Sequence, residues 1–132
     1  MKKIVVAFGL DESGELANKH YGDSDKFAIY EFYEDGTYKL IEYRENKAID
    51  IEEEEHEHHG DPRKFKVVIS QLKDVDVLAG YWFGPNLVRI RKSSNKVPFL
   101  TKTRSLNEAI KKIKTNFDEI WRQVEEKRRK IK

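Results

Sequence analysis

Residues 26–45 (KFAIYEFYEDGTYKLIEYRE) hold two segments of alternating apolar residues on either side of Asp35-Gly36. Such a pair between two alternating segments is the strongest local signal for a β-hairpin, because glycine accepts the positive φ of a tight turn. Phe27 and Ile29 share one face of the first arm, while Ala28, Tyr30 and Phe32 share the other. Because both faces of this arm are apolar, we expect it to lie inside a sheet.

The other apolar runs alternate between strand and helix patterns. Short β-branched runs predict strands over residues 2–10, 75–82 (bounded by Gly80) and 96–101, and helical spacing predicts helices over residues 61–75, 84–95 and 105–132. A helix between two strands implies a parallel pair joined by a right-handed crossover, whereas the hairpin adds an antiparallel strand. We therefore predict one α/β domain over residues 1–132, with a mixed five-stranded sheet and helices packed on it.

Capping residues mark where the predicted helices begin. Asp61 is placed to be an N-cap with Pro62 at the first helical position, and Pro85 falls in the first turn of the second helix. Ser105 and Glu108 have capping-box spacing. The last helix then carries one apolar stripe, which consists of Leu106, Ala109, Ile110, Ile113, Phe117, Ile120, Trp121 and Val124.

Composition and charge restrict the chemistry. The sequence contains no cysteine, so it offers no disulfide and no thiolate for catalysis or metal binding. The formal charge is +2, but residues 50–57 carry six acids and no base, so the rest of the chain sums to +8. There is no apolar run of about 18 residues and no secretory signal pattern, so we expect a cytoplasmic protein.

Residues 50–60 (DIEEEEHEHHG) are both acidic and rich in histidine. His56, His58 and His59 supply imidazoles suited to iron, zinc, copper or nickel, and the glutamates supply oxygen ligands. A like-charge run of this kind is also typical of a flexible, solvated loop. Both interpretations stay open at this point.

Two further candidates lie in loops at the predicted carboxyl edge of the sheet, where open α/β sheets bind ligands. His20, in KHYGDSDKF, suits either a metal or a backbone carbonyl. Residues 80–86 (GYWFGPN) join a strand to a helix N-terminus, where backbone N–H groups and the helix dipole favour an anion. Three aromatic residues between the glycines would wall a ligand there, although Gly84-Pro85 is also ordinary turn chemistry. Arg89 follows on the helix.

Two other functions have some support. The basic body and the C-terminal residues 126–132 would suit an interaction or nucleic-acid-binding module, although cations also complement the dipole at a helix end. Asp11, at the end of the first strand, resembles in its position a carboxylate of ribonuclease-H-type nucleases. A metal-dependent nuclease needs further carboxylates, and only Asp76 accompanies a later strand.

Two motifs resemble those of a known family. The first is His20-Tyr21-Gly22 followed by Phe27, Ile29 and Tyr30, and the second is Gly80 followed by Gly84-Pro85-Asn86. Over roughly residues 3–115 the sequence resembles the dinitrogenase iron-molybdenum cofactor biosynthesis family, of the NifX and NifB C-terminal-domain type. It departs from the family pattern at Tyr21, where phenylalanine is commoner, and in the two extra aromatic residues of the Gly80 turn.

The resemblance implies a ribonuclease-H-like fold and a non-enzymatic carrier of an iron-sulfur or iron-molybdenum-type cluster. Such a carrier binds its cluster transiently and works with metallocofactor assembly proteins, as a monomer or weak dimer, with no membrane and no nucleic acid as its partner. His20 would be the leading cluster ligand, and His56, His58 and His59 auxiliary metal contacts. The expected anion cradle consists of Gly22, Gly80, Gly84, Asn86 and Arg89.

Overall fold

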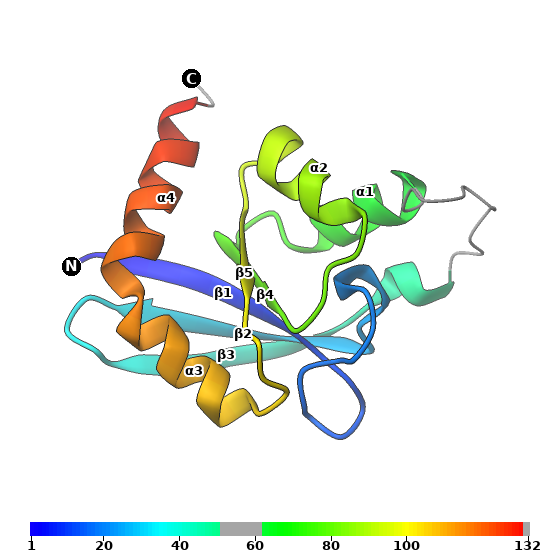
Figure 1. Ribbon diagram of the computed structural model, residues 1–132, viewed down its shortest axis with the longest axis horizontal. Helices are drawn as coiled ribbons and strands as arrows, with labels where there is room; N and C mark the ends of the chain where they lie inside the picture. Colours follow the sequence, from blue (N-terminus) through cyan, green and yellow to red (C-terminus); the bar gives the residue numbers. More distant parts are fainter. Residues whose placement is uncertain (51–61, 131–132) are drawn as a thin grey trace.

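The structure, a computed structural model, describes residues 1–50 and 62–130 (Figure 1). The elements are β1 (Lys3–Leu10), η1 (Tyr21–Asp23), β2 (Lys26–Tyr33), β3 (Tyr38–Glu45), η2 (Lys47–Asp50), α1 (Pro62–Gln71), β4 (Val77–Gly80), α2 (Asn86–Ser93), β5 (Val97–Leu100), α3 (Leu106–Thr115) and α4 (Phe117–Lys130). The single-turn 3₁₀ helices η1 and η2 have no counterpart in the sequence-based expectations. Residues 51–61, which contain the acidic loop after Asp50 and the expected N-cap Asp61, fall outside the described residues.

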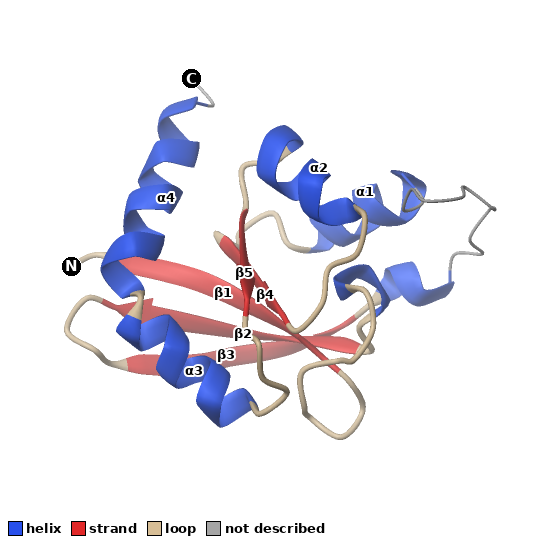
Figure 2. Ribbon diagram, in the orientation of Figure 1, coloured by secondary structure: helices blue, strands red, loops and turns tan. Residues whose placement is uncertain are grey.

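The five strands form one mixed sheet in the order β3-β2-β1-β4-β5 (Figure 2). β2 is antiparallel to β1 and to β3, whereas β1, β4 and β5 are parallel. The predicted mixed five-stranded sheet is confirmed, and β2 lies inside it as its two apolar faces require. The hairpin turn is closed by Asp35, whose Oδ1 accepts from the Thr37 backbone N–H at 3.0 Å, and by Gly36 at φ +88°.

Each face of the sheet has its own apolar core. On one face, which we call the α3–α4 face, strand residues such as Phe8 and Phe32 pack with Ile113 of α3 and Ile120 of α4. On the opposite α1–α2 face, the core contains Tyr21 of η1 together with residues of α1 and α2. The alternation along β1 and β2 sends successive side chains to these two cores in turn.

The prediction of a single last helix is wrong. Ser105 does cap its start, since its side chain accepts from the Glu108 N–H at 3.2 Å, but α3 ends at Thr115 and α4 begins at Phe117. Asn116, at φ −102° and ψ 16°, leaves the helical region, and its side-chain Nδ2 donates to the Lys112 carbonyl at 2.8 Å. Asparagine competes in this way with backbone hydrogen bonding and so favours a break.

The parallel pairing of β1 with β4 brings two loops to the same edge of the sheet. The loop after β1 leads through His20 to η1, and the loop after β4 leads through Gly84 to α2. None of the helices in the described part of the chain is long and apolar enough to cross a membrane.

Candidate functional site

Tyr21 fixes the His20 loop onto the sheet. The Tyr21 hydroxyl donates to the carbonyl of Ala7 in β1 at 2.7 Å, and its ring stacks on Phe83 with centroids 4.9 Å apart. Burial raises the pKa of Tyr21 well above its ordinary value, so the phenol remains a neutral O–H donor. The tyrosine that departs from the family pattern therefore has a structural reason: phenylalanine would lose this hydrogen bond.

Two glycines make room for the Tyr21 ring. A Cβ atom at Gly80 would lie 2.7 Å from Tyr21 Cδ1, and one at Gly9 would lie 3.0 Å from Tyr21 Cε1. Both distances are shorter than van der Waals contact between carbon atoms allows. The Tyr21 ring therefore occupies the space that a side chain at Gly80 would fill, so only the backbone of Gly80 is left to face a ligand.

His20 itself lies against Gly84. A Cβ at Gly84 would come within 2.6 Å of His20 Nε2 and Cδ2, and Gly84 has a φ of +68° that other residues rarely adopt. The Trp82 and His20 rings make a T-shaped contact with centroids 4.5 Å apart and planes at 76°. The two sequence motifs thus meet in space at a half-buried imidazole.

The aromatic residues of the turn divide into two roles. Phe83 is 2% exposed and belongs to the α1–α2 core, so the expectation that it walls a ligand is wrong. Trp82 is 51% exposed beside His20, and Tyr81 is also exposed. Only Tyr81 and Trp82 of the three therefore present a surface to a ligand.

Polar side chains from distant segments hold η1 in place. Asn46 Nδ2 donates to the carbonyls of Gly22 and Ser24, both at 2.8 Å. Lys64 of α1 forms an ion pair with Asp23 and is 8% exposed. These contacts position Gly22 in the anchored turn that follows His20. No sequence motif pointed to Asn46 or Lys64, because their partners lie far away along the chain.

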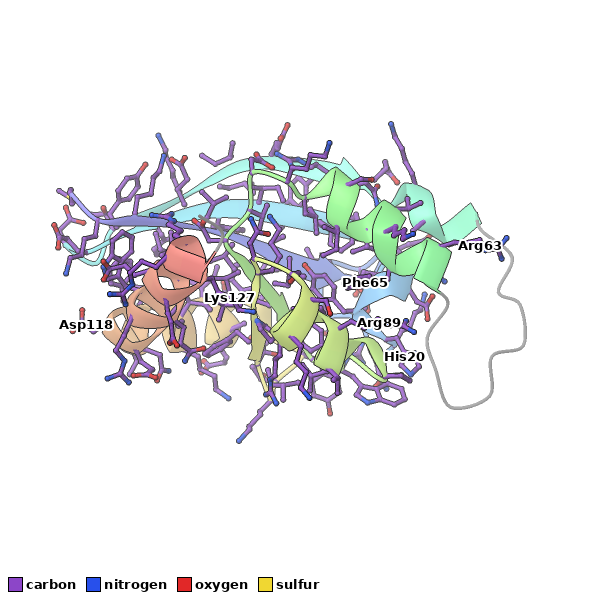
Figure 3. The ribbon with its side chains drawn as sticks, turned by 90° about the horizontal axis from the view of Figure 1, so that it is seen from above. His20, Arg63, Phe65, Arg89, Asp118 and Lys127 are labelled. Carbon is purple, nitrogen blue, oxygen red and sulfur yellow. The ribbon has the colours of Figure 1, made fainter. Side chains whose placement is uncertain are left out.

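The N-terminus of α2 faces the same corner. Asn86 begins the helix, and the N-cap position is Pro85, which makes no side-chain capping hydrogen bond. The first N–H groups of a helix and the positive end of its dipole attract anions. Arg89 adds a cation on α2, and Figure 3 shows Arg89 and His20 at the same end of the molecule, together with Phe65 of α1.

His20 is a solitary imidazole in the described part of the chain. Among residues 1–50 and 62–130, no three His, Asp or Glu side chains are arranged to hold a metal ion. The predicted contacts His56, His58 and His59 lie outside the described residues. One half-buried imidazole next to a helix N-terminus suits attachment of an anionic cargo at a single point more than enclosure of a bare cation.

Asp11 and Asp76 lie at opposite ends of the sheet. Asp11 follows β1, where its Oδ1 accepts from the Ser13 hydroxyl and its Oδ2 pairs with Arg104 at 2.8 Å. These partners hold the pKa of Asp11 below its ordinary value. Asp76 precedes β4, and its Oδ2 accepts from the Val5 N–H near the start of β1 at 2.9 Å. The two carboxylates therefore form no shared metal site.

Several basic residues of the C-terminal segment stabilise the fold. Lys127 Nζ donates to the carbonyls of Arg91 and Ser94, the latter at 3.0 Å, and so caps the C-terminus of α2. Arg128 pairs with Asp76 at 3.1 Å and lies over the Trp121 ring. The last two residues of the sequence, 131–132, lie outside the described residues.

The fold and this corner define a class: a small α/β protein whose sheet edge presents one histidine beside a helix N-terminus. A family model described as dinitrogenase iron-molybdenum cofactor matches residues 2–116, and the chain belongs to that family. A comparison with curated proteins found no match. The match ends at Asn116, where α3 gives way to α4, so α4 lies after the residues that the family model matches.

Proposed function

We propose that the protein is a non-enzymatic carrier of an iron-sulfur or iron-molybdenum-type cluster in metallocofactor assembly. The family supports a connection with the iron-molybdenum cofactor of dinitrogenase. The observation that carries the proposal for this chain is the imidazole of His20, held between Gly84 and Trp82 beside the start of α2.

The physical argument concerns charge and ligand number. A cluster of this kind is an anion, so the α2 N-terminus and Arg89 offset its charge while His20 supplies a nitrogen ligand. The chain has no thiolate to add. With few protein ligands, the cluster dissociates readily, as a carrier requires. We assign His56, His58 and His59 as auxiliary metal contacts, and Gly22, Gly80, Gly84 and Asn86 as the backbone around the cargo.

The remaining assignments follow from the same proposal. The strand order β3-β2-β1-β4-β5, with β2 antiparallel to its neighbours, supports a ribonuclease-H-like fold for one domain over residues 1–132. We place the carrier in the cytoplasm, with metallocofactor assembly proteins as its partners.

An anaerobic binding experiment tests the proposal. Full-length protein is mixed with isolated iron-molybdenum cofactor and, separately, with ferrous iron plus sulfide, and bound cluster is measured by electron paramagnetic resonance and visible absorption after gel filtration. We expect His20→Ala to weaken binding at least about tenfold, as loss of a metal-site interaction commonly does.

Lys111→Ala is the control, because it removes an exposed side chain of α3 and leaves every residue of the proposed site in place. We expect it to retain most of the binding, and both variants to keep the wild-type far-ultraviolet circular dichroism spectrum. If His20→Ala binds both cluster sources as well as wild type does, the assignment of His20 is wrong. If wild type binds neither source, the carrier function is wrong.

A further inference from the structure

β3 is an edge strand with an unusual surface. It ends the sheet order, so in the described part of the chain no strand pairs with its outer edge. Four of its apolar side chains are 43–53% exposed, namely Tyr38, Leu40, Ile41 and Tyr43. An exposed strand edge with apolar side chains is a template for pairing with another chain.

A β-bulge brings most of this apolar surface to one face. Tyr38, Leu40 and Tyr43 lie opposite Phe32, Tyr30 and Ala28 of β2, which all belong to the α3–α4 core. In a regular strand, Tyr43 would point away from the side on which Tyr38 and Leu40 lie. The register shifts between Ile29 and Tyr30, which leaves Ile41 as an extra residue and turns Tyr43 to the apolar side.

The opposite face of β3 is charged. Lys39 lies 3.7 Å from Glu31, and Arg44 pairs with Glu42 at 2.7 Å and with Asp74 at 2.8 Å. β3 therefore has an apolar side that continues the α3–α4 face and a charged side that continues the α1–α2 face. Any strand that pairs with β3 must match both sides.

We propose that β3 is the interface of a homodimer, in which two copies pair antiparallel about a twofold axis and their sheets become continuous. This proposal is independent of the proposed carrier function. The axis passes through Leu40, so that the Leu40 residues of the two copies lie opposite each other and Ile41 remains the extra residue of the bulge in each strand. Tyr38 then lies opposite Tyr43, and Lys39 lies opposite Glu42.

The choice of register follows from the bulge. Residues directly opposite in an antiparallel pair share a face of the sheet, and opposite charges or aromatic rings in such pairs stabilise it. The proposed register matches Tyr38 to Tyr43 on the apolar side and Lys39 to Glu42 on the charged side, each twice by symmetry. An axis centred on Lys39 would instead oppose the two Lys39 side chains, and one centred on Glu42 would oppose Lys39 to Arg44, so both alternatives place like charges opposite each other. The strand is therefore complementary to a second copy of itself.

Disulfide trapping tests the register, because the chain has no cysteine of its own. Tyr38→Cys and Tyr43→Cys proteins are oxidised separately and as a mixture, then separated on a non-reducing gel. In the proposed dimer, residue 38 of one copy lies opposite residue 43 of the other. Two copies of the same position stand four strand positions apart once the bulge is counted, or roughly 13 Å. We expect disulfide-linked dimers from the mixture and few from either variant alone. Equal trapping in all three samples, or none in the mixture, would overturn the register.

Analytical ultracentrifugation tests the dimer itself. Lys26 lies over the Tyr43 ring and Lys114 over the Tyr38 ring, so moderate salt is used to screen these cations beside β3. We expect a concentration-dependent dimer whose dissociation constant rises at least about tenfold in Ile41→Lys, because a lysine on an edge strand opposes pairing. Val88→Lys, which alters an exposed apolar residue of α2, is the matched control and should leave the constant unchanged. A monomeric wild type, or equal weakening in both variants, overturns the proposal.

Discussion

The two faces of the sheet are built differently. The α3–α4 face carries an apolar core in which the Phe8 and Tyr30 rings make a T-shaped contact with centroids 5.4 Å apart. Residues of α3 and α4 pack against these side chains of β1 and β2. The α1–α2 face adds buried polar groups to its apolar core, notably the Tyr21 hydroxyl, Asn46 and Lys64. The hydrophobic effect stabilises a fold but does not depend on the orientation of the buried groups. Hydrogen bonds require a defined distance and angle, so they fix the relative position of the groups that they join.

This difference explains where the candidate site lies. Each polar anchor of the α1–α2 face acts on η1, the turn that follows His20. Gly80 and Gly84 then let β4 and the start of α2 approach Tyr21 and His20 closely. Both faces thus stabilise the fold through their apolar cores, and the α1–α2 face in addition positions the imidazole.

The largest expected effect comes from deleting a core side chain on each face. Phe83→Ala should lower the free energy of unfolding by about 3–5 kcal/mol and Ile113→Ala by about 2–5 kcal/mol, since both side chains are buried and leave cavities. Of these two residues, Phe83 stacks on Tyr21, which follows His20, whereas Ile113 lies in the core of the other face. We therefore expect Phe83→Ala, and not Ile113→Ala, to shift the His20 ring signals in the NMR spectrum. Urea unfolding gives the free energies, and His20→Ala assigns the ring signals.

Equal shifts of the His20 signals in both variants would show that the two faces are coupled through the sheet. The conclusion that the α1–α2 face alone positions His20 would then be wrong, although the expected losses in free energy of unfolding would not be affected.

A smaller loss of stability is expected from two glycine variants, whose comparison separates the cost of backbone strain from the cost of a clash with His20. Gly84→Ala and Gly36→Ala both place a side chain at positive φ, at a cost of about 1–2 kcal/mol. An added Cβ at Gly36 meets nothing within 4 Å, whereas one at Gly84 meets the imidazole. We expect Gly84→Ala to be the less stable of the two and the only one to shift the His20 ring signals. The expectation fails if Gly36→Ala destabilises the protein as much as Gly84→Ala does.

Local signals explain what the sequence predicts well. The Asp35-Gly36 turn, the cap at Ser105 and the start of α1 at Pro62 depend on neighbouring residues, and the structure agrees with each. The break at Asn116 was missed for a physical reason. The Asn116 N–H still bonds to the Lys112 carbonyl at 3.0 Å, and the Ile120 N–H still bonds to the Asn116 carbonyl at 2.9 Å. The apolar stripe therefore continues across the break.

The candidate site was predictable only in part. His20 and the Gly80–Asn86 turn stand out as motifs, and the parallel pairing of β1 with β4 explains why they meet. The anchors do not stand out, because Asn46 is 24 residues from Gly22 and Lys64 is 41 residues from Asp23. Lysine and asparagine are usually exposed, so a sequence does not show that one of them is buried. Tertiary packing buries such a side chain and brings it to its hydrogen-bond partner.

The smallest effect concerns pH and a second buried cation near the α1–α2 face. Lys96 is 1% exposed, and its Nζ donates to the carbonyls of Lys73 and Val75 at 3.0 and 2.6 Å. Burial lowers the pKa of Lys96 from its ordinary value of 10.5, against the opposing charges of Asp76 and Asp74. The folded protein therefore releases this proton at a lower pH than the unfolded chain does. Relative to Lys96→Met, wild type should gain stability as the pH rises toward 10.5. Urea unfolding at a series of pH values measures the difference in free energy of unfolding between wild type and Lys96→Met. The corresponding difference between wild type and Ile113→Ala should not change with pH. A difference that falls as pH rises would mean that the two carbonyls stabilise the charged amine more than burial disfavours it.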